Sequence, residues 1–279
     1  MSDILLHLWP LVVATLLYAG LGVHFWRTRW YDADRHPSPL SMQPWERIAI
    51  AVTLGLHGIG LYESLLSAGG LRFSFSHAAS LMLWLAVLIY WLESFRSRMD
   101  GMQPMVLPLA SLASLLTIVF PQTHEIAYAN TIAFRSHFLS AMAAYSLFTL
   151  AALHALFMRL IEHKLHTRTI DRRLTSLPSI LSMEALLFRM IGIAFFLLTL
   201  AIASGAVFSE QIFGDALVFD HKTVFAFASW GIFAALLGGR HVYGWRGRIA
   251  LRWTLAGFLL LILAYIGTRF VLEVLLERT

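Results

Sequence analysis

The sequence predicts an all-α membrane protein of about eight transmembrane helices, with both ends of the chain on the outer side of the membrane. Three observations support this prediction. Of the 279 residues, 58% are apolar and 13% are charged, whereas a soluble domain carries about 25% charged residues. The apolar residues form eight long runs, and lysine and arginine gather in every second connection between them. A soluble enzyme, a disordered chain and a coiled coil are all excluded by this composition.

The apolar runs have the length that a membrane requires. A bilayer core about 30 Å thick needs roughly 20 apolar residues in one helix, and backbone in lipid must satisfy its own hydrogen bonds, which favours helices. The first run has no charged residue between Ile4 and Trp26 and no cleavage site after it, so we expect a permanent helix rather than a signal peptide. The eight predicted spans cover about residues 4–26, 48–68, 75–92, 104–120, 136–158, 190–209, 222–239 and 253–274.

Two segments have features beyond their hydropathy. The second span contains LGLHGIG at residues 54–60, whose glycines are typical of helices that pack closely. The stretch Ser179–Phe188 turns amphipathic after a basic loop, and we expect it to lie at the cytoplasmic interface before the sixth span. Residues 1–279 then form a single integral membrane domain, because no Gly/Ser-rich or Pro-rich linker divides the chain.

The distribution of lysine and arginine predicts the orientation. One set of connections holds sixteen of the 21 cations and the other holds five, and the cation-rich set belongs in the cytoplasm. This topology explains the net charge of +5, so no nucleic-acid partner is expected. The five outer cations are Arg72, Arg135, Lys222, Arg269 and Arg278.

The chain has no cysteine but twelve histidines, so imidazole is the soft nitrogen ligand available to a metal. His137 and His221 each begin a span at the outer side, and each has a cation beside it, Arg135 and Lys222 respectively. Haem iron takes neutral imidazole as an axial ligand, and haem propionates pair with arginine or lysine. Two histidines from separate helices could therefore hold one haem iron from both faces.

A simpler interpretation of the same residues stays open. A histidine at the membrane interface commonly has no ligand, Asp220 suits a helix N-cap, and Lys222 can extend toward water. Phe213 and Phe219 lie in the loop before the seventh span. They could form a platform for a porphyrin or anchor the loop among lipid headgroups.

Ionisable residues inside the spans are functional candidates by default. His57, Glu63 and His154 are three of these. Each histidine could instead be a buried side chain bonded to a neighbouring helix, and Glu63 could pair with a histidine or with Arg72. A transporter that uses His57 and Glu63 is a further hypothesis, although no pair of Gly/Pro-broken spans marks a substrate site.

The C-terminal half, about residues 130–279, resembles the cytochrome c assembly family, the CcsA/HemX/CcmC group of haem-handling membrane proteins, and within it the YpjD-type inner-membrane proteins of Gram-negative bacteria. The stretches that carry the resemblance are SHFLSAMAAYSLFTLAALHA (136–155), LPSILSMEALLFRMIGIAFFLLTLAIASGAVFSE (177–210), FDHKTVFAFASWGIF (219–233), GWRGRIAL (244–251) and GFLLLILAYIGTRFVLE (257–273).

This resemblance implies a haem-binding role for particular residues. Members of the family carry an external histidine at the start of a span, and His137 falls on that position. They also carry a tryptophan-rich external loop over which haem is presented. The corresponding stretch here is FGDALVFDHKTVF (213–225), in which the tryptophans are replaced and His221 takes the proline position. A membrane histidine of the family falls on Gly238.

The resemblance therefore implies a haem-handling protein of the inner membrane with both termini periplasmic, acting in c-type cytochrome biogenesis rather than as an independent catalyst. Its cofactor would be haem b. Its partners would be the lipid bilayer and other maturation proteins or the apocytochrome. Because the tryptophans are absent, a second hypothesis is a non-catalytic scaffold or regulator of haem synthesis that kept the fold and lost the cofactor.

Overall fold

The computed structural model describes residues 2–31, 42–65, 71–96, 101–125, 129, 131–166, 179–213, 221–271 and 274. The first seven predicted spans each fall on one long helix of this part of the chain, and the eighth falls on consecutive helical segments from Gly247 to Phe270. Seven of these helices are long and apolar enough to cross a membrane, and α4 is an apolar helix of 17 residues. The helices are α1 (Ser2–Phe25), α2 (Pro44–Leu65), α3 (Phe75–Glu93), α4 (Gln103–Val119), α5 (Ile132–His166), α6 (Ile180–Phe213), α7 (His221–Tyr243) and α8 (Gly247–Ile262).

Short elements extend or connect these helices. The π-helix η1 (Trp26–Tyr31) continues α1, while η4 (Leu263–Gly267) and α9 (Thr268–Phe270) continue α8. Two short strands, β1 (Arg72–Phe73) and β2 (His124–Glu125), pair antiparallel with Arg72 opposite Glu125. This pair ties the segment before α3 to the segment after α4.

The sixth helix begins ten residues before its predicted span. The stretch Ser179–Phe188 leads directly into it, because α6 runs without a break from Ile180 to Phe213, and the place of this stretch at the cytoplasmic interface stays a prediction. The charged residues in its first turns have partners on other helices. Glu184 accepts a hydrogen bond from Arg240 of α7 at 2.7 Å, and Arg189 pairs with Glu93 of α3. The pair with Arg240 compensates the burial of the Glu184 carboxylate, whereas the Arg189 side chain is exposed.

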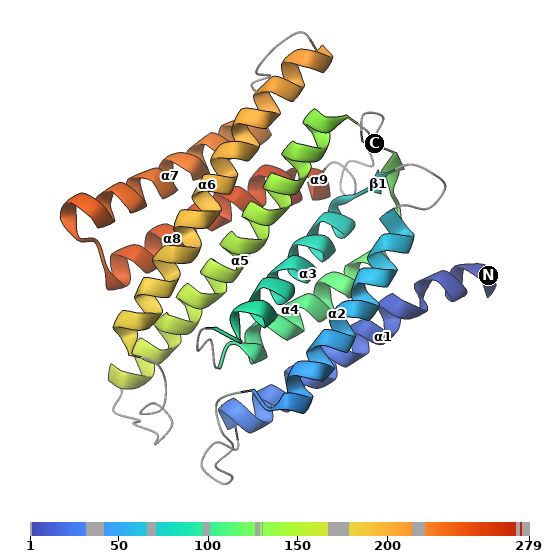
Figure 1. Cartoon of the computed structure of the whole chain (residues 1–279), viewed down its shortest axis with the longest axis horizontal. Coiled ribbons are helices and arrows are strands. Elements are labelled where there is room, and N and C mark those ends of the chain that lie inside the picture. The colour runs from blue at the N-terminus through green and yellow to red at the C-terminus, as the bar shows by residue number, and fades with distance from the viewer. Residues whose placement is uncertain are drawn as a thin grey trace.

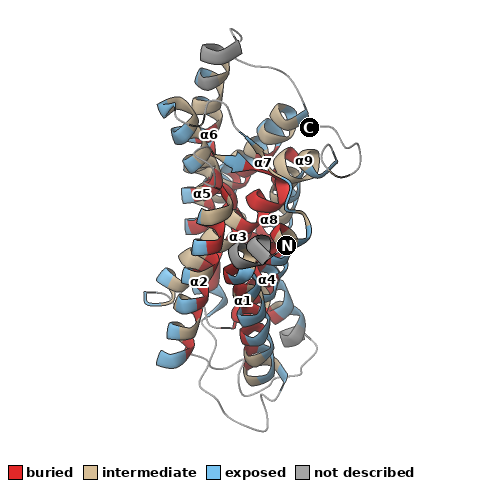
Figure 2. Ribbon diagram, turned by 90° about the vertical axis from the view of Figure 1, so that its right-hand side faces the viewer, coloured by how far each residue is buried: buried red, intermediate tan, exposed pale blue. Residues whose placement is uncertain are grey.

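Helix α5 occupies the middle of the bundle. It packs against α3 and α4 of the N-terminal half and against α6 and α8 of the C-terminal half, as Figure 1 shows. Helices α1 and α2 cover the N-terminal half from outside, while α6 and α7 cover the other side (Figure 1). In Figure 2 buried residues follow the helix faces that meet other helices, and exposed residues follow the outer faces. An apolar outer face suits a bundle surrounded by lipid.

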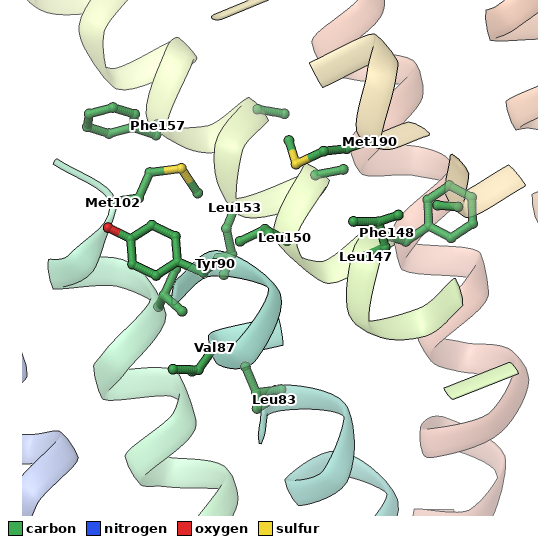
Figure 3. Close-up of a cluster of buried hydrophobic side chains, with 14 of the residues drawn as sticks. Leu83, Val87, Tyr90, Met102, Leu147, Phe148, Leu150, Leu153, Phe157 and Met190 are labelled. Carbon is green, nitrogen blue, oxygen red and sulfur yellow. The ribbon is translucent and has the colours of Figure 1, made fainter. Parts of the chain in front are cut away.

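The core joins the two halves through side chains of α5. Figure 3 shows Met102, Tyr90 and Phe157 gathered where α3, α4 and α5 meet, and all three are buried. On the other side of α5, Phe148 stacks on Phe233 of α7 with ring centroids 3.9 Å apart. Aromatic pairs of this kind contribute about 0.5–1.5 kcal/mol beyond their buried area. The two halves therefore form one connected core.

Glycine allows the closest helix contacts in the N-terminal half. A Cβ atom at Gly60 would lie 2.6 Å from Cγ of Leu11, and one at Gly22 would lie 2.8 Å from Cγ of Pro108. Neither glycine could therefore carry a side chain without moving α1. The prediction of close packing for residues 54–60 is confirmed by Gly60.

Candidate functional site

His137 lies in the second turn of α5, with its imidazole against the backbone of α6. Its Nδ1 is 2.9 Å from the carbonyl oxygen of Ala201. A carbonyl oxygen only accepts hydrogen bonds, so Nδ1 carries the proton and donates it. In the neutral ring the lone pair is then on Nε2. Histidines that bind metals commonly donate their other ring N–H to a backbone carbonyl in this way.

The absence of a side chain at Gly205 leaves space for the His137 imidazole. Gly205 lies one turn after Ala201 on the same face of α6. A Cβ atom at this position would be 3.1 Å from both Cε1 and Nδ1 of His137. Two backbone features of α6, a carbonyl and an absent side chain, therefore hold the ring in its place.

The remaining predicted site residues lie at nearby helix ends. Arg135 is exposed in the first turn of α5, and its Nε donates to the carbonyl of Ala129 at 3.3 Å. His221 is the exposed first residue of α7, and Lys222 follows it half-buried. Phe213 ends α6. Phe219 and Asp220 lie outside the described residues, and so does the N-cap interpretation of Asp220.

The packing of α7 on α6 gives the approximate depth of His221. Nε1 of Trp230 donates to Oγ1 of Thr199 at 3.0 Å, and the helices run in opposite directions (Figure 1). His221 precedes Trp230 by nine residues, which is about 13 Å of helix. Counted back from Thr199, His221 is therefore at the height of a point on α6 roughly one to two turns beyond Ala201 and Gly205, toward the C-terminal end of α6. Both histidines thus lie near the same end of α6.

His57 and His77 are buried and bonded to hydroxyl groups. Nε2 of His57 is 2.8 Å from Oγ of Ser80 on α3, as expected for a buried histidine bonded to a neighbouring helix. Nδ1 of His77 is 2.8 Å from Oγ of Ser74, the N-cap residue of α3. Among the described residues, no group of three histidine, cysteine or carboxylate side chains could hold a metal ion.

Neither pairing considered for Glu63, with a histidine or with Arg72, is found among the described residues. Its Oε2 is buried without a hydrogen-bond partner there. Arg72 donates from Nε to Oγ1 of Thr123 at 3.0 Å, next to the strand pair. No contact between Glu63 and His57 is therefore found that would support the transporter hypothesis.

One cluster was not found by reasoning from the sequence. Glu46 is 1% exposed and receives two hydrogen bonds from Nη2 of Arg29 at 2.9 and 3.0 Å. It also accepts from the backbone N–H of Gln43 at 2.7 Å and lies 2.9 Å from Nε2 of His24. A glutamate at the third position of a helix, reaching back to its N-cap, is half of a capping box, and this was the available signal. The cluster joins α1 to α2.

Comparison with known proteins identifies relatives over most of the chain. The family model for the cytochrome C assembly protein matches residues 45–276. The chain is 26% identical to the inner membrane protein YpjD of Escherichia coli strain K12 over 236 residues, which are 83% of this chain and 89% of that protein. With seven apolar helices long enough to span, this similarity makes the chain a multi-pass inner-membrane protein.

Two shorter similarities concern other relatives. The chain is 39% identical to the cytochrome c biogenesis protein CcsA of Prochlorococcus marinus strain MIT 9215 over 88 residues, which are 32% of this chain and 28% of that protein. It is 33% identical to an uncharacterised 28.8 kDa protein of Azospirillum brasilense over 140 residues, which are 50% of this chain and 52% of that protein.

Proposed function

Because this chain belongs to the cytochrome C assembly protein family, we propose that it binds haem at the periplasmic face of the inner membrane and acts in c-type cytochrome biogenesis. The observation that carries the proposal is the imidazole of His137. Its Nδ1 donates to the Ala201 carbonyl, and the resulting tautomer offers Nε2 to a metal. The similarity to a protein named for cytochrome c biogenesis supports the process.

The residues near this end of α6 fit the requirements of a haem. His137 and His221, at the start of α7, would hold the haem iron through imidazole nitrogens. Arg135 and Lys222 would pair with the propionates, since Arg135 lies two residues before His137 on α5 and Lys222 directly follows His221 on α7. Phe213 at the end of α6, and Phe219 and Asp220 shortly before α7 in the sequence, would cover the porphyrin.

The protein would then supply position and surroundings, while the iron and porphyrin supply the redox chemistry. His137 holds its side chain against a rigid helix, so little side-chain entropy is lost when a ligand binds. The outer orientation of this end follows from the sixteen cations assigned to the opposite side. Both termini are periplasmic in this proposal, and the partners are maturation proteins or an apocytochrome.

The test is the absorption spectrum and haem content of the full-length protein, purified in detergent and titrated with haem. We expect a Soret band with one haem per chain, reduced at least tenfold in affinity by His137→Ala and also weakened by His221→Ala. Matched controls lie at the opposite ends of the same helices. His163→Ala on α5 and His241→Ala on α7 should bind haem as the wild type does.

Two results would contradict the proposal. Wild-type protein without a Soret band that also refuses added haem would favour the second hypothesis, a scaffold that kept the fold and lost the cofactor. Equal haem binding by wild type and His137→Ala would remove the assigned ligand. In that case the search for the ligand would move to the other histidines.

A further inference from the structure

His154 has an unusual pair of neighbours inside the bundle. It lies in α5, seventeen residues after His137, which is about 26 Å along the helix. The side chain is 2% exposed. Its Nε2 is 2.9 Å from the carbonyl oxygen of Met183 on α6, and its Nδ1 is 3.2 Å from Sδ of Met102 at the start of α4. Figure 3 shows the Met102 side chain reaching toward α5.

The hydrogen-bonding roles of these atoms follow from their chemistry. The Met183 carbonyl can only accept, so Nε2 of His154 carries a proton and donates it. In the neutral imidazole the lone pair is then on Nδ1. The thioether sulfur of Met102 has lone pairs and no hydrogen. Two electron-pair donors therefore face each other at 3.2 Å in a buried, apolar place.

A hydrogen bond from a protonated Nδ1 of His154 to Sδ of Met102 would be energetically unfavourable. It would create an imidazolium inside a membrane-spanning helix, where a charged side chain costs several kcal/mol unless it is paired. A thioether is a weak acceptor and returns little of that free energy. Among the described residues, the hydrogen-bond partners of His154 are the Met102 sulfur and the Met183 carbonyl, and neither is a carboxylate. A soft metal ion between the two atoms would use both lone pairs instead.

We propose that His154 and Met102 form a binding site for a soft monovalent metal ion, with Cu(I) as the physiological ion. Thioether and imidazole ligands together favour Cu(I) over harder ions. The donation from Nε2 to a backbone carbonyl is the outer contact that metal-binding histidines usually make. This site is separate from the proposed haem site, since a different histidine near the opposite end of α5 forms it.

The geometry needs only a small adjustment to accept an ion. Nitrogen and sulfur ligands at about 2.0 and 2.3 Å from a tetrahedral ion are about 3.5 Å apart. The observed 3.2 Å therefore has to widen by a few tenths of an ångström. Methionine adapts easily because its unbranched side chain has three rotatable bonds. Two further buried methionines, Met158 and Met183, lie one turn along α5 from His154 and on the facing turn of α6.

The experiment is a competition for Cu(I) between the full-length protein in detergent and a coloured Cu(I) chelator, in the presence of a reductant and without oxygen. Met102→Leu removes the sulfur at nearly constant volume. His154→Gln keeps an amide N–H near the position of Nε2 and removes the Nδ1 donor. The matched control is Met142→Leu, another buried methionine of α5, about 18 Å from His154 along the helix.

We expect the wild type and Met142→Leu to take one equivalent of Cu(I) from the chelator. Met102→Leu and His154→Gln should each bind this equivalent at least tenfold more weakly. X-ray absorption at the copper edge should show nitrogen and sulfur ligands in the wild type. Thermal melting of all four proteins checks that each is folded. The proposal is overturned if the wild type withdraws no Cu(I), or if Met102→Leu and His154→Gln retain the same equivalent as the wild type.

Discussion

Replacing Gly205 by alanine perturbs the His137 imidazole without changing any group that could bind haem. The added Cβ would be 3.1 Å from Cε1 and Nδ1 of the ring. Ordinary Cβ contacts begin near 3.4 Å, so the ring must retreat by about 0.3 Å. The hydrogen bond from Nδ1 to the Ala201 carbonyl, now 2.9 Å, would lengthen toward the upper limit for an N–H···O bond.

The expected effects on stability and on haem binding have different sizes. Alanine favours a helix over glycine by about 1 kcal/mol, while a weakened hydrogen bond costs about 0.5–1.5 kcal/mol. The free energy of unfolding should therefore change by less than about 1 kcal/mol. Haem affinity should fall by about tenfold or more, because losing the outer contact of a metal-binding histidine typically costs 10–100-fold.

The assay is haem titration of purified Gly205→Ala followed at the Soret band, together with thermal melting. Gly192→Ala is the matched control, since it makes the same change on the same helix where no atom lies within 4 Å of the new Cβ. We expect Gly192→Ala to bind haem normally. Wild-type affinity in Gly205→Ala, or an equal loss in both variants, would refute the role of α6 in holding the ring.

Three further predictions concern the fold. Glu46→Gln removes the carboxylate that pairs with the charge of Arg29, which is 5% exposed. It should lower the free energy of unfolding by about 3–5 kcal/mol. The control Glu162→Gln, at an exposed ion pair, should lower it by at most about 1 kcal/mol, and thermal melting compares the two variants. Gly60→Ala would bring its Cβ to 2.6 Å from a leucine carbon of α1 and should lower the free energy of unfolding by about 1–3 kcal/mol. Gly55→Ala places its Cβ in open space and should not destabilise the protein. Equal melting temperatures of the two variants would contradict this packing. Reporters that are active only in the periplasm should be active when fused to either end of the chain, and activity at neither end would reverse the proposed orientation.

The helices could be predicted from the sequence because the membrane imposes a length. The first seven apolar runs each match one helix, and the eighth matches α8 with its continuation through η4 and α9. Within the described residues, seven helices are long and apolar enough to cross a membrane. The start of α6 was harder to predict. Helix α6 begins ten residues before its predicted span, and the partners of Glu184 and Arg189 near its start are on α7 and α3. Partners far apart in the chain cannot be read from local hydropathy.

The site could be predicted only in part for the same reason. The position of His137 at the start of a span, beside Arg135, was a visible pattern. Its contact with Ala201 joins residues 64 positions apart and required the structure. The hydrogen-bonded cluster around Glu46 was missed because Arg29, its ion-pair partner, follows a different helix. The pairing of His137 with His221 on one iron stays a prediction.

The central claim is that the His137 imidazole binds haem iron, and rescue by free imidazole tests it most directly. His137→Gly removes the ligand and leaves a space between α5 and α6 that imidazole can enter. Added to this variant with haem, imidazole should restore the low-spin spectrum of the wild type at millimolar concentration. A variant that already shows the wild-type spectrum without imidazole, or whose spectrum imidazole does not change, would contradict the claim.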